Sequence, residues 1–157
     1  MNKLIIYAGK TGCTEKCAKI LEQRLSNATV IDITKEKVDI SAYDLIIIGS
    51  SIRVGKIHKE VKKFINDNQG VLKDKKTAYY ICCGFSKNYK QYFEDNIPKE
   101  LLNAAIVYDT FGGELDITKQ KGIDKLIIRI VSKTEEGKKE IKILTGNIDR
   151  FIDKLGG

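Results

Sequence analysis

Five short apolar runs alternate with stretches in which apolar residues recur at helical spacing. The first run, residues 3–7 (KLIIY), and the third, residues 44–49 (DLIIIG), are rich in isoleucine and are followed by Gly-containing segments, a pattern typical of buried strands. The other three runs are residues 28–33, 77–83 and roughly 105–115. Runs that are apolar on both faces predict parallel strands covered on both sides.

The stretches between these runs predict helices. Thr14 is a predicted N-cap for a helix with one apolar face, formed by Cys17, Ala18, Leu21 and Leu25. Further helices are predicted from Ile57 to Ile65, near residues 89–95, near residues 122–133 and near residues 146–155. Strands that alternate with helices predict an α/β fold, in which right-handed crossovers build a parallel sheet with helices on both faces. Ligands bind beyond the carboxyl ends of such strands, so the loops after the first, third and fourth strands form the candidate site.

Composition narrows the class of protein. A chain of 157 residues suits a single domain over residues 1–157, and 42% apolar with 31% charged residues suits an ordinary globular protein. The apolar run near the N-terminus is too short for a signal-peptide core and no apolar stretch is long enough to cross a bilayer, so we expect a cytoplasmic protein. The four cysteines lack the spacing of a zinc site, which predicts reduced thiols and no metal.

The net charge of +7 favours anionic partners, although no interleaved aromatic motif supports nucleic-acid binding. Within the loop after the first strand, GKT suggests an ATP-binding P-loop, but that motif requires Gly where Leu4 stands. The spacing of Gly9 and Gly12 also excludes the dinucleotide fingerprint. What remains is a hydroxyl- and Gly-rich turn at a helix N-terminus, which favours a monophosphate. The plainer alternative is a tight turn with no ligand.

The segment YAGKTGCTEKCA, residues 7–18, resembles the phosphate-binding loop of flavodoxins. Its residues Gly9, Thr11, Gly12, Thr14 and Glu15 fall in register with that loop. Two residues depart from the flavodoxin pattern. Lys10 offers the phosphate a charge-assisted contact, whereas Cys13 replaces the usual Asn and donates poorly. The resemblance implies a flavodoxin-like sheet in order 2-1-3-4-5 with noncovalently bound FMN.

A second segment, GSSIRVGKIHKEVKKFI at residues 49–65, resembles the menaquinone-dependent protoporphyrinogen IX dehydrogenases of flavodoxin type. The tail from Phe111, with FGGELD, IDKLIIRIVSK and EEGKKEI, also resembles that family. This resemblance implies an oxidoreductase that passes electrons from a reduced tetrapyrrole through FMN to a quinone. Two alternatives stay open: a soluble electron carrier between redox partner proteins, and a flavodoxin-fold scaffold that has lost FMN.

In flavodoxins, aromatic side chains from two loops hold the flavin ring. The first of these loops here has no aromatic residue and offers Ser50, Ser51, Ile52, Arg53, Val54 and Gly55. The second offers Cys83, Gly84, Phe85 and Tyr89, of which Tyr89 is the better stacking candidate. An Arg53 cation near the flavin would stabilise an anionic reduced ring and favour electron acceptance, unless Arg53 points into solvent.

Two further features are open to interpretation. A basic stripe on the helix predicted near residues 122–133 suits anionic lipid, hence a peripheral place at the inner face of a membrane, or tetrapyrrole propionates, but also suits a solvated face. The stripe consists of Lys121, Lys125, Arg129 and Lys133. His58, among lysines at a predicted helix start, is expected to be exposed rather than catalytic. No residue is assigned as a catalytic acid or base.

Overall fold

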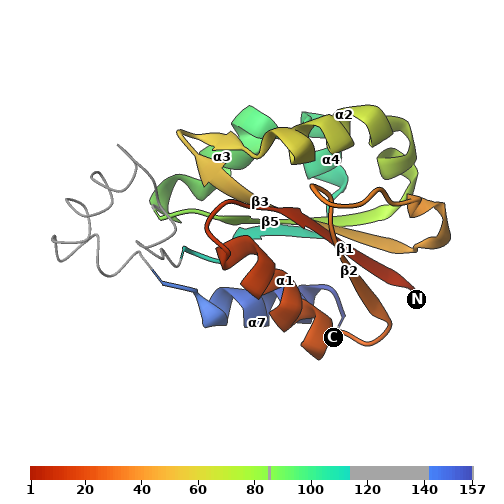
Figure 1. The fold of residues 1–157 in the computed structure, drawn as a ribbon, viewed down its shortest axis with the longest axis horizontal. Coiled ribbons are helices and arrows are strands. Elements are labelled where there is room, and N and C mark those ends of the chain that lie inside the picture. Colours follow the sequence, from red (N-terminus) through yellow and green to blue (C-terminus); the bar gives the residue numbers. More distant parts are fainter. Residues whose placement is uncertain (85, 114–141, 157) are drawn as a thin grey trace, which may run out of the picture.

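A parallel sheet forms the centre of the molecule (Figure 1). The computed structural model describes residues 1–84, 86–113 and 142–156. The parallel strands are β1 (Lys3–Ala8), β2 (Ala28–Asp32), β3 (Leu45–Arg53), β5 (Lys76–Cys82) and β6 (Val107–Thr110). They lie in the order β2-β1-β3-β5-β6, which confirms the predicted order 2-1-3-4-5 when only parallel strands are counted.

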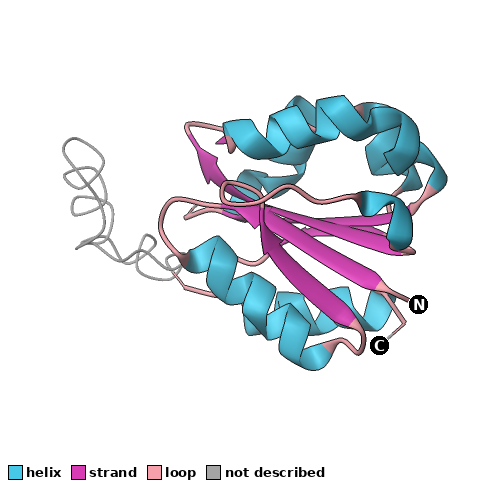
Figure 2. Cartoon of the chain, turned by 45° about the vertical axis from the view of Figure 1, so that its right-hand side comes forward, coloured by secondary structure: helices cyan, strands magenta, loops and turns pink. Residues whose placement is uncertain are grey.

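Helices cover both faces of the sheet, as Figures 1 and 2 show. One face carries α1 (Cys13–Arg24) and α7 (Thr145–Lys154), and the other carries α2 (Lys59–Asp74), α3 (Tyr89–Asn96) and α4 (Lys99–Ala104). The short strand β4 (Lys56–Ile57) and two single-turn 3₁₀ segments, Ile40–Ala42 and Ser86–Asn88, complete the described elements. None of the helices in residues 1–84, 86–113 and 142–156 has the length and apolar character needed to span a membrane.

Two predicted strand boundaries were wrong, and one helix was missed. The fifth predicted strand is shorter than expected, because β6 begins at Val107 and ends at Thr110. Helix α4 was not predicted; it is only one and a half turns long and is held by two buried leucines, Leu101 and Leu102, rather than by a long apolar stripe. The third strand is longer than expected, because it continues to Arg53 as one arm of a β-hairpin with β4. The helix predicted near residues 122–133 lies outside the described residues.

The strands alternate side chains between two hydrophobic cores. In β1, Leu4 and Ile6 join the core beneath α2, α3 and α4, whereas Ile5 and Tyr7 join the core beneath α1 and α7. This alternation follows from the two-residue period of a strand. Because both faces are covered, both sets of side chains are apolar, which is why the runs read as continuous.

Tyr80 of β5 links the second core to the start of α1. Its ring stacks on Phe111 with centroids 4.7 Å apart and meets Phe151 of α7 edge-on. The ring lies over Gly49 of β3, where any Cβ would collide with it. The Tyr80 hydroxyl donates a hydrogen bond of 2.9 Å to the carbonyl oxygen of Thr14. A buried aromatic cluster therefore supports the first turn of α1.

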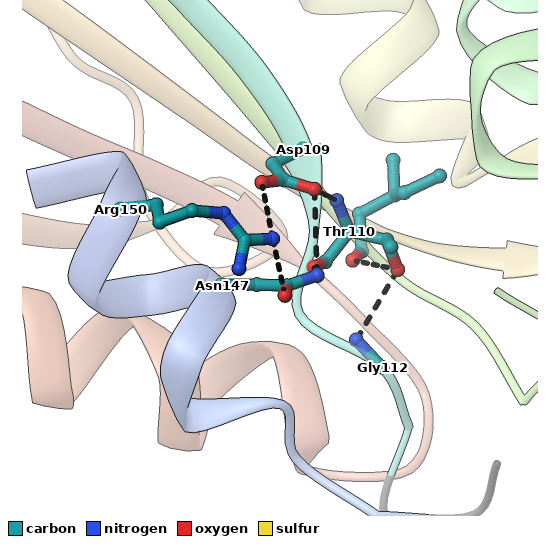
Figure 3. Close-up of polar contacts among 6 residues, drawn as sticks. Asp109, Thr110, Gly112, Asn147 and Arg150 are labelled. Carbon is teal, nitrogen blue, oxygen red and sulfur yellow. Dashed lines mark hydrogen bonds and ion pairs between the residues drawn. The ribbon is translucent and has the colours of Figure 1, made fainter. Parts of the chain in front are cut away.

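Polar contacts attach α7 to the end of β6 (Figure 3). The Asn147 side-chain amide donates to the Thr110 carbonyl oxygen at 2.8 Å, and the Thr110 hydroxyl accepts from the Gly112 amide at 3.2 Å. Arg150 donates to the Asn147 side-chain oxygen at 2.6 Å and lies 3.8 Å from a carboxylate oxygen of Asp109. Burial raises the pKa of Asp109 even though Arg150 opposes the shift. These contacts fix the carboxyl end of β6 against α7.

Candidate functional site

The carboxyl ends of three strands meet at one edge of the sheet. The register pairs Ala8 of β1 with Ser50 of β3, and Ser51 of β3 with Cys82 of β5. A Cβ placed on Gly9 would lie 3.8 Å from the Ser51 Cβ. The three predicted site segments thus begin side by side.

The first segment leads into α1 through Gly12. Gly12 occupies the N-cap position with φ of 86°, a left-handed conformation that glycine adopts without strain. The prediction that Thr14 caps the helix was wrong, because α1 begins at Cys13 and Thr14 is its second residue. The turn at Gly12 starts the helix one residue before Thr14, so the Thr14 hydroxyl does not cap it. The first-turn amides have no partner within the helix and so suit an anion.

The Thr14 hydroxyl is buried and, among the described residues, has no hydrogen-bond partner. It faces Gly9, since a Cβ at Gly9 would lie 2.6 Å from Thr14 Oγ1. Gly9 thus lets the Thr14 side chain lie against the backbone of the loop, where any Cβ would collide with it. Native structures rarely leave a buried hydroxyl unpaired, so this hydroxyl and the first-turn amides together fit a hydrogen-bonding phosphate at this helix start.

Cys13 turns its thiol into the core rather than toward the predicted phosphate position. Its side chain is only 3% exposed, and its Sγ lies within 4.8 Å of those of Cys17 and Cys82 in the core beneath α1 and α7. The Cys13 side chain therefore does not take the place of the usual Asn donor. At this position, the group placed to meet a phosphate is the backbone amide at the start of α1.

The second segment, residues 50–56, was predicted as a loop and is instead part of a β-hairpin. Strand β3 continues to Arg53, turns at Val54 and Gly55, and pairs antiparallel with β4 (Lys56–Ile57). Both turn residues have positive φ, 52° at Val54 and 72° at Gly55, which matches the twist of a two-residue hairpin turn. Val54 is a β-branched residue in a left-handed conformation and its side chain is 90% exposed. The sequence carries no hairpin signal here, because Val54 stands where such turns favour Asn, Asp or Gly.

Asn96, the last residue of α3, holds this hairpin. Its side-chain amide donates to the Gly55 carbonyl oxygen at 2.8 Å and to the Tyr92 carbonyl oxygen at 2.7 Å. Its side-chain oxygen accepts from the Ile57 amide at 3.2 Å. Sequence reasoning missed Asn96, because an Asn at the end of a predicted helix carries no signal that its partners lie about forty residues earlier.

His58 was expected to be exposed, but it is half-buried and caps α2. Its Nδ1 accepts from the Glu60 amide at 3.1 Å, and its own amide donates to the Ser50 hydroxyl at 2.9 Å. Burial lowers the pKa of His58, and the nearby Lys10 cation lowers it further. A neutral imidazole is needed here, since only an unprotonated Nδ1 accepts a hydrogen bond.

A small basic cavity lies between the first segment and the hairpin. Its volume is about 200 Å³, and it is lined by Lys10, Ser51, Arg53, Lys56, Ile57, His58 and Lys59. Four of these residues are cationic and none is acidic, so the cavity suits an anion. A larger cavity of about 380 Å³ lies between α2 and the segment after β2, where acidic and basic side chains mix, away from the three segments.

The third segment follows β5. Cys83 is buried with its Sγ 3.5 Å from the Thr110 hydroxyl, and Gly84 is half-buried. Tyr89 begins α3 and its ring packs edge-on against Phe93, with centroids 6.4 Å apart. Phe85 lies outside the described residues, as do Lys121, Lys125, Arg129 and Lys133 of the predicted basic stripe.

Comparisons with solved structures find the same fold in several flavoproteins. Flavodoxin 1 from Bacillus cereus, in its oxidised form, aligns with a TM-score of 0.56 and 20% identity, over 90% of this chain and 100% of that one. A flavoprotein from Lactobacillus acidophilus NCFM, solved in complex with FMN, aligns with a TM-score of 0.54 and 15% identity, over 69% of this chain and 92% of that one. The two-electron reduced flavodoxin of Megasphaera elsdenii aligns with a TM-score of 0.51 and 21% identity, over 69% of this chain and 84% of that one.

A search of curated proteins found no match to the sequence. The profile of one protein family, described as Flavodoxin domain, matches residues 4–142. That span contains all three segments at the carboxyl edge of the sheet. With the strand order and the phosphate-type loop after β1, this match shows that the chain belongs to the flavodoxin-domain family.

Proposed function

We propose that this protein binds FMN noncovalently at the carboxyl edge of its sheet and works as a redox protein. The observation that carries the proposal is the Thr14 hydroxyl, which is buried at the start of α1 against Gly9 and has no hydrogen-bond partner among the described residues. A phosphate at this position would receive that hydroxyl together with the first-turn amides of α1. The FMN complex of the Lactobacillus acidophilus flavoprotein and the family match support FMN as the source of the phosphate.

Each segment has a role in the proposed site. Residues Gly9, Lys10, Thr11, Gly12, Cys13 and Thr14 would hold the phosphate. The residues proposed to flank the flavin ring are Ser50, Ser51, Ile52, Arg53, Val54, Gly55, Cys83, Gly84, Phe85 and Tyr89. When bound, FMN supplies one- and two-electron transfer, and the protein contributes position and electrostatics. Cations around the 200 Å³ cavity would favour added negative charge in the site and so raise the tendency to accept electrons.

We propose further that the protein is an oxidoreductase of the protoporphyrinogen dehydrogenase kind, with a reduced tetrapyrrole as donor and a quinone as acceptor. The supporting observation is the cavity with four cationic and no acidic lining residues beside the proposed cofactor site, which suits the carboxylates of a tetrapyrrole. Such a protein would work in the cytoplasm, close to a membrane that holds the quinone.

A carrier that exchanges electrons with a redox partner protein is the second candidate. It is favoured by Val54, an apolar side chain that is 90% exposed at the tip of the hairpin bordering the proposed cofactor site. Beside a redox centre, this side chain would add apolar contact area to brief docking of a partner protein. Transient redox complexes use small interfaces, and the hairpin tip would form part of such a contact.

An anaerobic reductive titration of the FMN-loaded protein tests the binding proposal. We expect flavin absorbance bands that shift on binding, and a midpoint potential that falls by on the order of 10–30 mV in Arg53→Gln. Arg24→Gln is the matched control, because Arg24 is an arginine on α1 that pairs with Asp149, outside the three site segments. Failure to take up FMN would refute the proposal.

Turnover experiments separate the two candidates. Protoporphyrinogen oxidation with a soluble menaquinone analogue, dependent on FMN and weakened when Lys56 and Lys59 are both changed to Gln, would support the enzyme. FMN uptake without such turnover, together with electron exchange with a carrier protein that weakens in Val54→Ser, would support the carrier instead.

A further inference from the structure

Three cysteine thiols meet in the core beneath the site. Cys13 and Cys17 of α1 and Cys82 of β5 place their Sγ atoms within 4.8 Å of one another, and we call them the three-thiol cluster. Sγ of Cys82 lies 3.8 Å from Sγ of Cys17, far beyond the length of a disulfide bond. The exposed fractions of the side chains are 3%, 0% and 5%.

The periodicity of a helix and the alternation of side chains along a strand bring the three thiols together. Cys13 and Cys17 are four residues apart, so they lie on the same face of α1. Cys82 points to that face because side chains alternate along β5, while the adjacent Cys83 points to the opposite core. The linear sequence shows neither relationship as a metal motif, because 65 positions separate Cys17 from Cys82.

The donor set selects the kind of ligand. Three sulfurs converge without a nitrogen or carboxylate donor among the described residues. The single His of the chain, His58, caps α2 on the other side of the sheet. Zinc prefers four ligands in a tetrahedron, whereas soft thiolates alone select ions such as Cu(I).

The sulfur separations suit a three-coordinate ion. Three equal metal–sulfur bonds of about 2.3 Å in a plane place the sulfurs about 4.0 Å apart. The 3.8 Å separation of the Cys17 and Cys82 sulfurs is close to this value, and the remaining pairs lie within 4.8 Å. Small rotations of the Cys13 side chain would close the triangle.

We propose that the three-thiol cluster is a Cu(I) site. Binding replaces thiol protons, which leave to solvent, so the metal meets thiolates. Cys13 is the first residue of α1, where the positive end of the helix dipole favours a thiolate. Cys13 lies within the first site segment and Cys82 directly precedes the third, so both are at the carboxyl edge of the sheet, and this edge gives the ion a short way in.

Retention of Cu(I) by the FMN-loaded full chain under anaerobic conditions tests the proposal. The protein is mixed with a Cu(I) salt, then dialysed against a chromogenic Cu(I) chelator, and the metal that remains is counted per chain. We expect one retained Cu(I) with sulfur-to-copper charge-transfer absorbance in the wild type, and loss of both in Cys82→Ala. Cys83→Ala is the matched control, since it removes a neighbouring buried thiol on the other side of the sheet and should retain the ion.

Two further measurements keep the test decisive. Circular dichroism establishes that Cys82→Ala is folded, and Cys13→Ser provides a second ligand variant at the edge of the cluster that should also lose the ion. Equal retention by the wild type and both ligand variants would overturn the proposal, as would no retention by the wild type. Retention of Zn²⁺ in preference to Cu(I) would overturn the assignment of a three-coordinate monovalent ion.

Discussion

The side-chain amide of Asn96 lies 2.8 Å from the carbonyl oxygen of Gly55, so the last residue of α3 fixes the tip of the β3–β4 hairpin. The hairpin borders the proposed FMN site, and its position depends on this helix end. The same Asn accepts from the Ile57 amide at 3.2 Å, which ties down both sides of the turn.

Replacing Asn96 with Ala should loosen the hairpin. Loss of these partly buried hydrogen bonds is expected to lower the free energy of unfolding by about 2 kcal/mol and to weaken FMN binding. Urea denaturation and flavin fluorescence titration measure the two effects. Asn68→Ala is the matched control, because Asn68 also donates to a carbonyl one helical turn earlier but lies within α2, outside the hairpin and the three site segments. Equal FMN affinity in both variants would contradict the role of Asn96.

Thr14→Val tests the role of the Thr14 hydroxyl, because it should raise the stability of the FMN-free protein and lower the affinity for FMN. Removal of an unpaired buried hydroxyl should raise the stability of the FMN-free protein by about 1 kcal/mol, since the desolvation cost disappears. The same change should weaken FMN binding about tenfold, the equivalent of roughly 1.4 kcal/mol. Thr14→Ser keeps the hydroxyl and should retain most of the affinity. A Val variant that binds FMN as tightly as the wild type would remove Thr14 from the site.

Val54→Asn should stabilise the hairpin turn. Val54 has φ of 52°, where a β-branched side chain costs about 1–2 kcal/mol and Asn is tolerated. The midpoint of urea denaturation is therefore expected to rise, with an unchanged slope against denaturant. Val71→Asn controls for loss of an exposed valine, because Val71 is 44% exposed on α2 and is helical. An equal or lower midpoint in Val54→Asn would show that the turn is not strained.

His58 should make stability depend on pH. Its pKa in the folded protein lies below the ordinary value of 6.5, so the unfolded chain binds the proton more readily. The cap to the Glu60 amide is therefore fully present above about pH 6.5 and is lost as the pH falls below it, at a cost of up to about 1 kcal/mol. His58→Ser keeps an N-cap acceptor that does not titrate. Unfolding free energies of the two proteins are measured from pH 8 to about pH 5. As the pH falls, the wild type should lose stability relative to His58→Ser. A constant difference between them would contradict the role of His58.

The fold followed closely from the sequence, because the runs of residues 3–7 and 44–49 are apolar on both faces and parallel strands buried on both sides need that pattern. The loop of residues 9–14 was placed for the same reason, as the Gly-containing turn after the first buried strand. The hairpin at Val54 and Gly55 was missed because a Val at positive φ opposes local preference and depends on tertiary contacts from Asn96.

The helix cap at Thr14 was misjudged on local grounds, since a hydroxyl at a helix start usually caps it and Gly12 here begins the helix first. The three-thiol cluster could not be predicted from the sequence for a different reason. Its members become neighbours only through the packing of α1 on β5, which no spacing along the chain encodes.

The contact between Tyr80 and the Thr14 carbonyl oxygen has a thermodynamic consequence. The Tyr80 ring stacks on Phe111 and meets Phe151 of α7, so the start of α1 and the C-terminal helix share one buried support. A ligand that holds the start of α1 stabilises everything that must remain packed for Tyr80 to stay in place, by linkage between binding and local unfolding. A ligand bound at the start of α1 should therefore slow amide hydrogen exchange in α7.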